Sequence, residues 1–263
     1  MRVISFMNQK GGVGKTTTCH NVGAALSLCG FKVLLVDIDP QASLSQSAGF
    51  DEIGDDEPTV YEVLKGSDIN AAIRSHNGRY DVLPSEIRLS AGEIELVTRS
   101  RRNELLRDAL RALKTEYDFI LVDCPPSLNI FTLMALTASD EVIVPVEAQY
   151  LPLKGVSQIV DTVKLVKSQI NKELNIGGIL VTFFDKRQNL DREVLEALKD
   201  YFGDKVFSTT ISRNTMVARA PSHGEDIFEY SARSRGAEQY KALAEEIVNM
   251  KPQKRKRGND NGK

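Results

Sequence analysis

The sequence predicts a three-layer α/β sandwich around a mostly parallel central sheet of about seven or eight strands. Short apolar runs rich in β-branched residues recur along the chain. They are continuous rather than alternating, which is typical of strands covered on both faces. Stretches of helical length separate them, and Gly30 follows the first, where a C-terminal cap is expected. Strands are expected over 3–6, 33–36, 119–122, 142–144 and 179–181, and helices over 16–28, 101–114, 153–170, 190–201 and 234–250.

Composition and charge narrow the class of protein. Residues 1–250 contain no internal repeat and no Pro/Ser-rich linker, so a single domain is expected there. Residues 251–263 carry six Lys/Arg and one Asp and are expected to be a disordered basic tail. The net charge of −2 excludes a basic DNA-binding module by composition alone. No apolar stretch approaches the roughly 18 residues of a membrane span, and three cysteines without CxxC spacing indicate reduced thiols in the cytoplasm.

A glycine-rich segment, NQKGGVGKTT at residues 8–17, lies between the first expected strand and the first expected helix. Glycines let backbone N–H groups turn inward around an anion, and the helix adds its positive N-terminus. Lys15 supplies charge for the β- and γ-phosphates, and the Thr16 hydroxyl can ligate Mg²⁺. A generic P-loop would have glycine where this chain has Gln9, and a second lysine, Lys10, follows. The segment predicts a fold and a nucleotide site of the P-loop NTPase type.

Carboxylates end two of the expected strands. Asp37 and Asp39 follow the run at 33–36, and Asp123 follows the run at 119–122. Because parallel α/β folds bind ligands at the carboxyl ends of their strands, these acids are expected beside the glycine-rich loop.

The loop with two lysines resembles the deviant Walker A motif of the ParA/MinD family of P-loop ATPases, in which the additional lysine is the signature residue. The resemblance implies that Lys10 contacts the nucleotide of the partner subunit across a sandwich dimer. The segment DIDPQ at 37–41 resembles switch I, in which Asp39 positions the attacking water and a metal-bound water. The run that ends in Asp123 resembles Walker B, whose acid reaches Mg²⁺ through water.

The resemblance also implies a set of site residues. Lys10, Lys15 and Asp39 are the expected catalytic residues, and Thr16, Asp39 and Asp123 are the expected metal site. The expected ATP contacts are Lys10, Gly11, Gly12, Val13, Gly14, Lys15, Thr16 and Thr17, with Arg213 and Asn214 beside the adenine.

The resemblance runs from Val3 to about Val248 and is closest to the Soj-like chromosome-partitioning ParA branch, on segments such as AGEIEL at 91–96 and APSHG at 220–224. It implies a Mg²⁺-dependent ATPase that forms a homodimer around two ATP molecules and binds double-stranded DNA without sequence preference. A ParB-like centromere-binding partner would stimulate hydrolysis and release it, moving a chromosome or plasmid. The expected location is the nucleoid in the cytoplasm. Membrane binding is not expected, because the tail lacks the apolar face it requires.

Two stretches depart from the branch. Residues 212–221 usually read like PRNVRLSEAP, and Met216 stands where the branch carries a DNA-contacting arginine. Arg219 lies one helical turn further on and compensates if this segment is helical. The expected DNA-binding residues are Arg187, Arg219, Arg233 and Arg235. Residues 147–150, Glu-Ala-Gln-Tyr, differ from the usual QCEY-like sequence.

Three alternatives remain open. A related ATPase could position another cargo, such as a chemoreceptor array or a carboxysome. A P-loop ligase or reductase could use ATP to drive synthesis, and it would ignore DNA. A nucleotide-dependent regulator could act by binding another protein.

Overall fold

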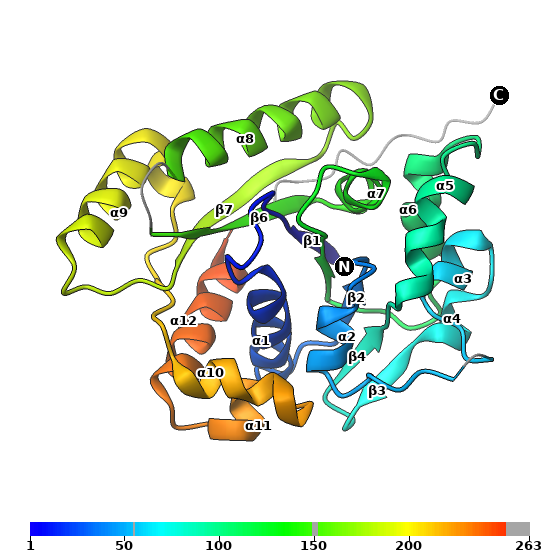
Figure 1. The fold of residues 1–263 in the computed structure, drawn as a ribbon, viewed down its shortest axis with the longest axis horizontal. Coiled ribbons are helices and arrows are strands. Elements are labelled where there is room, and N and C mark those ends of the chain that lie inside the picture. Colours follow the sequence, from blue (N-terminus) through cyan, green and yellow to red (C-terminus); the bar gives the residue numbers. More distant parts are fainter. Residues whose placement is uncertain (55, 149–151, 251–263) are drawn as a thin grey trace.

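The computed structural model describes residues 1–54, 56–148 and 152–250, without the side chains of 152–154. A seven-stranded sheet runs through these residues in the order β3-β4-β2-β5-β1-β6-β7 (Figure 1). All neighbouring strands are parallel except β3, which pairs antiparallel with β4. The strands are β1 (Arg2–Phe6), β2 (Val33–Asp37), β3 (Arg74–His76), β4 (Tyr80–Leu83), β5 (Phe119–Asp123), β6 (Glu141–Glu147) and β7 (Asn175–Thr182).

Helices cover both faces of the sheet, with α7 and α8 on one side and α1 and α12 on the other (Figure 1). The first face carries α3 (Val60–Lys65), α4 (Ile69–Ala72), α5 (Gly92–Glu95), α6 (Leu105–Arg111), α7 (Ile130–Ala138), α8 (Pro152–Gln169) and α9 (Asn189–Phe202). The second face carries α1 (Lys15–Leu28), α2 (Ser43–Ser47), α10 (Thr215–Arg219), α11 (Ile227–Ser231) and α12 (Arg235–Asn249). The three-layer α/β sandwich predicted from the sequence is therefore confirmed.

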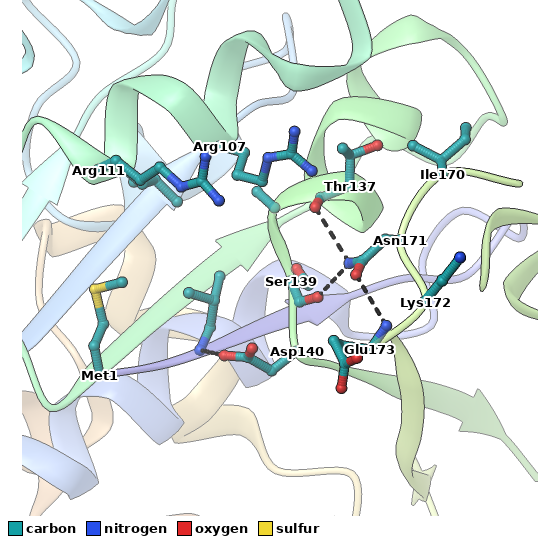
Figure 2. Close-up of a pocket in the computed structure, with 13 residues that line it drawn as sticks. Met1, Arg107, Arg111, Thr137, Ser139, Asp140, Ile170, Asn171, Lys172 and Glu173 are labelled. Atoms are coloured by element: carbon teal, nitrogen blue, oxygen red, sulfur yellow. Dashed lines mark hydrogen bonds between the residues drawn. The ribbon is translucent and has the colours of Figure 1, made fainter. Parts of the chain in front are cut away.

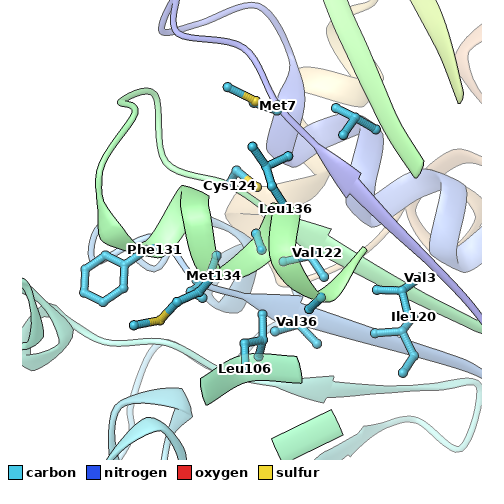
Figure 3. Close-up of a cluster of buried hydrophobic side chains, with 14 of the residues drawn as sticks. Val3, Met7, Val36, Leu106, Ile120, Val122, Cys124, Phe131, Met134 and Leu136 are labelled. Carbon is cyan, nitrogen blue, oxygen red and sulfur yellow. The ribbon is translucent and has the colours of Figure 1, made fainter. Parts of the chain in front are cut away.

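Successive strand residues supply two separate cores. On β5, Ile120 and Val122 pack into the core of the first face, and Phe119 and Leu121 pack into the core of the second. Figure 3 shows part of the first core, where Leu106 and Met134 from the helices lie near Val122 and its neighbours on the sheet. Every residue of β2 and β5 is buried. Burial on both faces is why these runs are continuously apolar in sequence.

Local structure differs from the sequence prediction in several regions. The hairpin of β3 and β4, the short helices between residues 43 and 95, and the helices α7, α10 and α11 were not predicted. The helix expected over 101–114 is shorter, because Arg101 adopts a left-handed backbone (φ 57°) and a 3₁₀ turn at Arg102–Glu104 precedes α6. The predicted tail at 251–263 lies outside the described residues, and a single domain over 1–250 stays a prediction.

Candidate nucleotide-binding site

The glycine-rich loop connects the end of β1 to the start of α1. Gly12 and Gly14 adopt φ of 71° and 83°, a region that side-chain-bearing residues rarely enter. These two positions turn the loop back toward the N-terminus of α1, where Gly14 is the N-cap. A Cβ atom at Gly11 or Gly12 would meet nothing within 4 Å. The loop therefore presents bare backbone to open space, as an anion cradle requires.

Hydrogen bonds to strands β6 and β7 hold this loop in place. Asn8 Nδ2 donates a 2.6 Å hydrogen bond to the Pro145 carbonyl of β6, while Asn8 Oδ1 accepts from the Lys10 N–H at 3.0 Å. Thr182 Oγ1, at the end of β7, donates to the Val13 carbonyl at 2.9 Å. Contacts within the protein thus fix the loop near both of its ends.

The two loop lysines are placed differently. Lys15 is only 7% exposed, and its Nζ donates to the Lys10 carbonyl at 3.3 Å, across its own loop. Burial lowers the pKa of Lys15, although the charges of Asp123 and Asp39 oppose the shift. The Lys10 side chain is 55% exposed and forms an ion pair with Glu147 at 3.1 Å. Lys15 is therefore committed to its own loop, while Lys10 is accessible from outside.

Three aspartates meet beside the loop, as the strand order requires. Asp37 and Asp123 are directly opposite in the β2–β5 register. Asp37 is fully buried and accepts from the Asp39 N–H at 3.1 Å and from the N–H and hydroxyl of Ser45 at 2.9 and 2.8 Å. Burial raises the pKa of Asp37 to about 6. Asp37 therefore shapes the segment that carries Asp39, a role that the sequence analysis did not assign.

The donors around Asp123 suit a magnesium ion. Thr16 Oγ1 donates to Asp123 Oδ2 at 2.6 Å, and Asp123 Oδ1 is buried with no hydrogen-bond partner among the described residues. Burial and the charge of Asp37 raise the pKa of Asp123. A hard cation held by hydroxyl and carboxylate oxygens would neutralise this charge. Thr16, Asp39 and Asp123 are the residues that would hold Mg²⁺, directly or through water.

The structure also places a residue at the site that the sequence analysis did not assign. Glu147, at the end of β6, accepts from Lys10 through Oε2 and from Arg213 Nη2 through Oε1 at 3.0 Å. The Arg213 guanidinium lies 5.1 Å from the centre of the Phe183 ring. The available signal was an acidic residue at the carboxyl end of the expected strand over 142–144.

A hollow of about 480 Å³ lies beside the loop that follows β7. Arg213 and Asn214, expected beside the adenine, line it, and so do Arg187 and Arg235. Asn214 also caps α10, since its side chain accepts from the N–H groups of Met216 and Val217. Arg187 is paired with Asp185 at 2.7 Å. The structure thus brings two of the four expected DNA-contacting arginines together.

Arg219 and Arg233 are exposed and lie outside that hollow. Compensation of Met216 by Arg219 requires this segment to be helical, and α10 spans Thr215–Arg219 as a helix.

A second hollow, of about 420 Å³, opens at the opposite edge of the sheet, where β1, β6 and β7 begin (Figure 2). Its polar groups bond mainly within the protein. Asp140 accepts from the Val3 N–H at 2.8 Å, and Asn171 donates to the carbonyls of Thr137 and Ser139. None of the predicted site residues lines it.

A bare glycine loop at a helix N-terminus, a buried lysine, and a hydroxyl paired with a strand-end carboxylate together define a P-loop ATPase. A family model described as an AAA domain matches residues 1–176. The chain is 48% identical to the sporulation initiation inhibitor protein Soj of Bacillus subtilis over 94% of this chain and 98% of that protein. It is 45% identical to the chromosome-partitioning ATPase Soj of Treponema pallidum over 94% and 97%. The chain belongs to the ParA/MinD family, in its Soj-like branch of chromosome-partitioning ATPases.

A solved structure supports the cofactors. Cobyrinic acid a,c-diamide synthase from Mycobacterium smegmatis, with bound ADP and magnesium, superposes with a TM-score of 0.82 at 36% identity and covers 94% of each chain. The same enzyme has also been solved with an ATP analogue and magnesium. The protein is an ATPase that uses ATP and Mg²⁺. Within the part of the chain that the structure describes, no helix is long and apolar enough to cross a membrane.

Proposed function

We propose that this ATPase forms a homodimer when it binds ATP, binds double-stranded DNA without sequence preference, and is released when a ParB-like partner stimulates hydrolysis. The position of Lys10 carries the proposal. Its ammonium group pairs with Glu147 at the end of β6, whereas that of Lys15 bonds to its own loop, and the Lys10 side chain is 55% exposed. A lysine so placed can reach the phosphates of a nucleotide held by a second subunit, where a charge-assisted contact is strong.

The chemistry follows from the placement of the other groups. Lys15 and the N–H groups of the loop bind the phosphates, and Lys10 of the partner adds charge as the phosphoryl group leaves. Asp39, positioned by Asp37, orients the attacking water. Mg²⁺ held by Thr16 and Asp123 would neutralise charge on the phosphate oxygens.

DNA binding requires positive charge that the composition does not supply. The chain carries a net charge of −2, so a single copy has little general attraction for phosphate. Arg187 and Arg235 share one hollow, and Arg219 is exposed on α10. We assign these residues, with Arg233, to a basic strip whose two copies act together in the dimer. In the cell, this activity places the protein on the nucleoid in the cytoplasm, where it moves a chromosome or plasmid.

A second candidate function is favoured by one comparison. The synthase of known structure is 36% identical over nearly its whole length and carries the name of an ATP-using amide-forming enzyme. The higher identity to Soj proteins supports the partitioning role instead.

The response of ATP hydrolysis to added DNA distinguishes the partitioning ATPase from the synthase. We expect ATP hydrolysis to rise when non-specific duplex DNA and a ParB-like partner are added, and DNA retention in a filter or sedimentation assay to require ATP. Two unrelated duplexes of equal length serve as the control for sequence preference. A hydrolysis rate indifferent to DNA, together with no ATP-dependent DNA retention, would contradict the proposal and favour the synthase.

A further inference from the structure

Glu147 places one carboxylate between two cations of the nucleotide site. Each of its two oxygens pairs with a different cation: Oε2 lies 3.1 Å from Lys10 Nζ, and Oε1 lies 3.0 Å from Arg213 Nη2. The Glu147 side chain is only 12% exposed, whereas those of Lys10 and Arg213 are 55% and 72% exposed. The carboxylate is therefore the buried member of the group, and the two cations are its exposed partners.

The backbone around Glu147 explains why the carboxylate is fixed. Asn8 ties the loop to the carbonyl of Pro145, two residues earlier on β6. The Ala148 N–H donates to the Thr182 carbonyl at 3.4 Å, directly after Glu147. The carboxylate thus stands on a strand end bonded on both sides.

The two cations are not held equally. Arg213 also lies against the Phe183 ring, 5.1 Å from its centre, which restrains the guanidinium beside Glu147. A mostly buried carboxylate is weakly screened and requires a counter-charge. Because Arg213 supplies one, Lys10 can move away without leaving the carboxylate unpaired.

We propose that Glu147 restrains Lys10 within its own subunit, so that the phosphates of the partner's nucleotide must displace this carboxylate before the dimer forms. Glu147 is thus a positioning residue that sets the ATP concentration at which dimerisation occurs. This inference rests on the proposed function, in which Lys10 acts across the dimer.

The test compares Glu147→Gln with Glu141→Gln. The amide introduced by Glu147→Gln can still accept a hydrogen bond from Arg213, but the loss of the negative charge weakens the attraction between this side chain and Lys10. Glu141 is a matched control, because it starts the same strand, is 9% exposed and pairs with Arg2 at 2.6 Å, away from the site. Light scattering across an ATP titration measures the dimer, and thermal unfolding checks the fold.

We expect Glu147→Gln to raise the ATP-dependent dimerisation constant by about tenfold, because a gain of about threefold per subunit enters twice. Glu141→Gln should leave the ATP dependence of dimerisation unchanged. Glu147→Ala is the second variant, for use if Glu147→Gln lowers the thermal midpoint, and it should also raise the dimerisation constant. The double variant Lys10→Ala/Glu147→Gln should show no gain. The ATP affinity of this double variant is compared with that of Lys10→Ala alone. Any difference measures the effect of Glu147→Gln on ATP binding through Arg213, and this effect is subtracted.

The outcomes separate the two proposals. If Lys10→Ala abolishes the dimer but Glu147→Gln needs equal or more ATP than the unaltered protein, the restraint by Glu147 is wrong and the role of Lys10 stands. If Lys10→Ala still dimerises with ATP, the action of Lys10 across the dimer is wrong, and the restraint fails with it.

Discussion

The Thr16 hydroxyl and the Asp123 carboxylate are joined by a 2.6 Å hydrogen bond that links the start of α1 to the end of β5. One carboxylate oxygen is thereby satisfied, and the other is buried with no hydrogen-bond partner among the described residues. A buried carboxylate oxygen without a partner destabilises a fold, and a bound cation would satisfy it.

Asp123→Asn should lower ATP hydrolysis without lowering the thermal stability of the protein. Asparagine can still accept the Thr16 hydrogen bond but carries no charge, and burial already raises the pKa of Asp123. We expect the thermal midpoint at pH 7 without Mg²⁺ to stay level or rise, while Mg²⁺-dependent ATP hydrolysis falls by at least about a hundredfold, or about 2.7 kcal/mol. A variant that hydrolyses ATP normally would remove Asp123 from the metal site.

Lys15→Ala should weaken nucleotide binding. It removes a buried ammonium group from a loop otherwise built of backbone N–H groups. We expect the ATP dissociation constant measured by calorimetry to rise about tenfold or more, equivalent to about 1.4 kcal/mol. Lys32→Ala, an exposed lysine just before β2, is the control and should bind ATP normally. Equal affinities for the two variants would contradict the P-loop role of Lys15.

Asp39→Ala should have the opposite effect on the dimer to Lys10→Ala. Without the carboxylate that orients water, ATP is not hydrolysed and the dimer of Asp39→Ala persists. Loss of Lys10 should abolish the ATP-dependent dimer but leave ATP binding by the monomer largely unchanged. Size-exclusion chromatography with light scattering, run with ATP and Mg²⁺, distinguishes the two. A monomeric Asp39→Ala protein that binds ATP would show that Asp39 is needed for assembly rather than for hydrolysis.

The basic strip should control the salt dependence of DNA binding. Arg219→Ala changes two arginines in a dimer, so the slope of log K against log salt concentration should flatten by about 2. Arg111→Ala, an exposed arginine on α6, should leave the slope unchanged. If deletion of residues 251–263 removes all DNA binding while Arg187→Glu and Arg219→Glu have no effect, the tail is the DNA-binding element.

His20 should make the fold sensitive to acid. Burial, with a contribution from His76, lowers the pKa of His20 to about 3. In the unfolded chain its pKa is about 6.5, so below that pH the unfolded state takes up a proton that the folded state does not. Stability therefore falls as the pH falls from about 6.5 toward 3, by up to about 1.4 kcal/mol per pH unit.

His20→Gln tests this dependence by urea unfolding at pH 6.5 and 5. The glutamine can keep a hydrogen bond to the Tyr80 hydroxyl, which lies 2.7 Å from His20 Nε2, but it cannot take up the proton. We expect a smaller loss of stability between the two pH values. His223→Gln, at an exposed position, should behave as the unaltered protein, and an equal loss in all three would exclude His20 as the cause.

The central strands and the loop could be predicted because their physical signals are local. Continuous apolar runs follow from burial on both faces, and the glycines at 12 and 14 follow from a backbone that requires positive φ. The edge hairpin could not be predicted, because β3 has only three residues and its one buried side chain is His76. The left-handed backbone at Arg101, which shortens the following helix, leaves no mark in the residue type.

The pairing of Glu147 could not be predicted for a different reason. Its two cationic partners lie in the glycine-rich loop and just before α10, far away in sequence. Only the sheet order, which sets β6 beside β1 and β7, brings them together. The same applies to the hollow that joins Arg187 to Arg235, because Arg187 lies just before α9 and Arg235 begins α12.

The hydrogen bond from Thr182 to Val13 of the loop determines when the nucleotide site can form during synthesis. The ribosome makes the loop first, yet its supports on β6 and β7 follow well over a hundred residues later. A domain grows from its N-terminus, and contacts between distant segments form only after the intervening chain is available. A nascent chain that ends before Thr182 therefore has the phosphate-binding sequence without the structure that shapes it. Capture of ATP thus reports that the chain has been made at least as far as Thr182 and has folded around the loop.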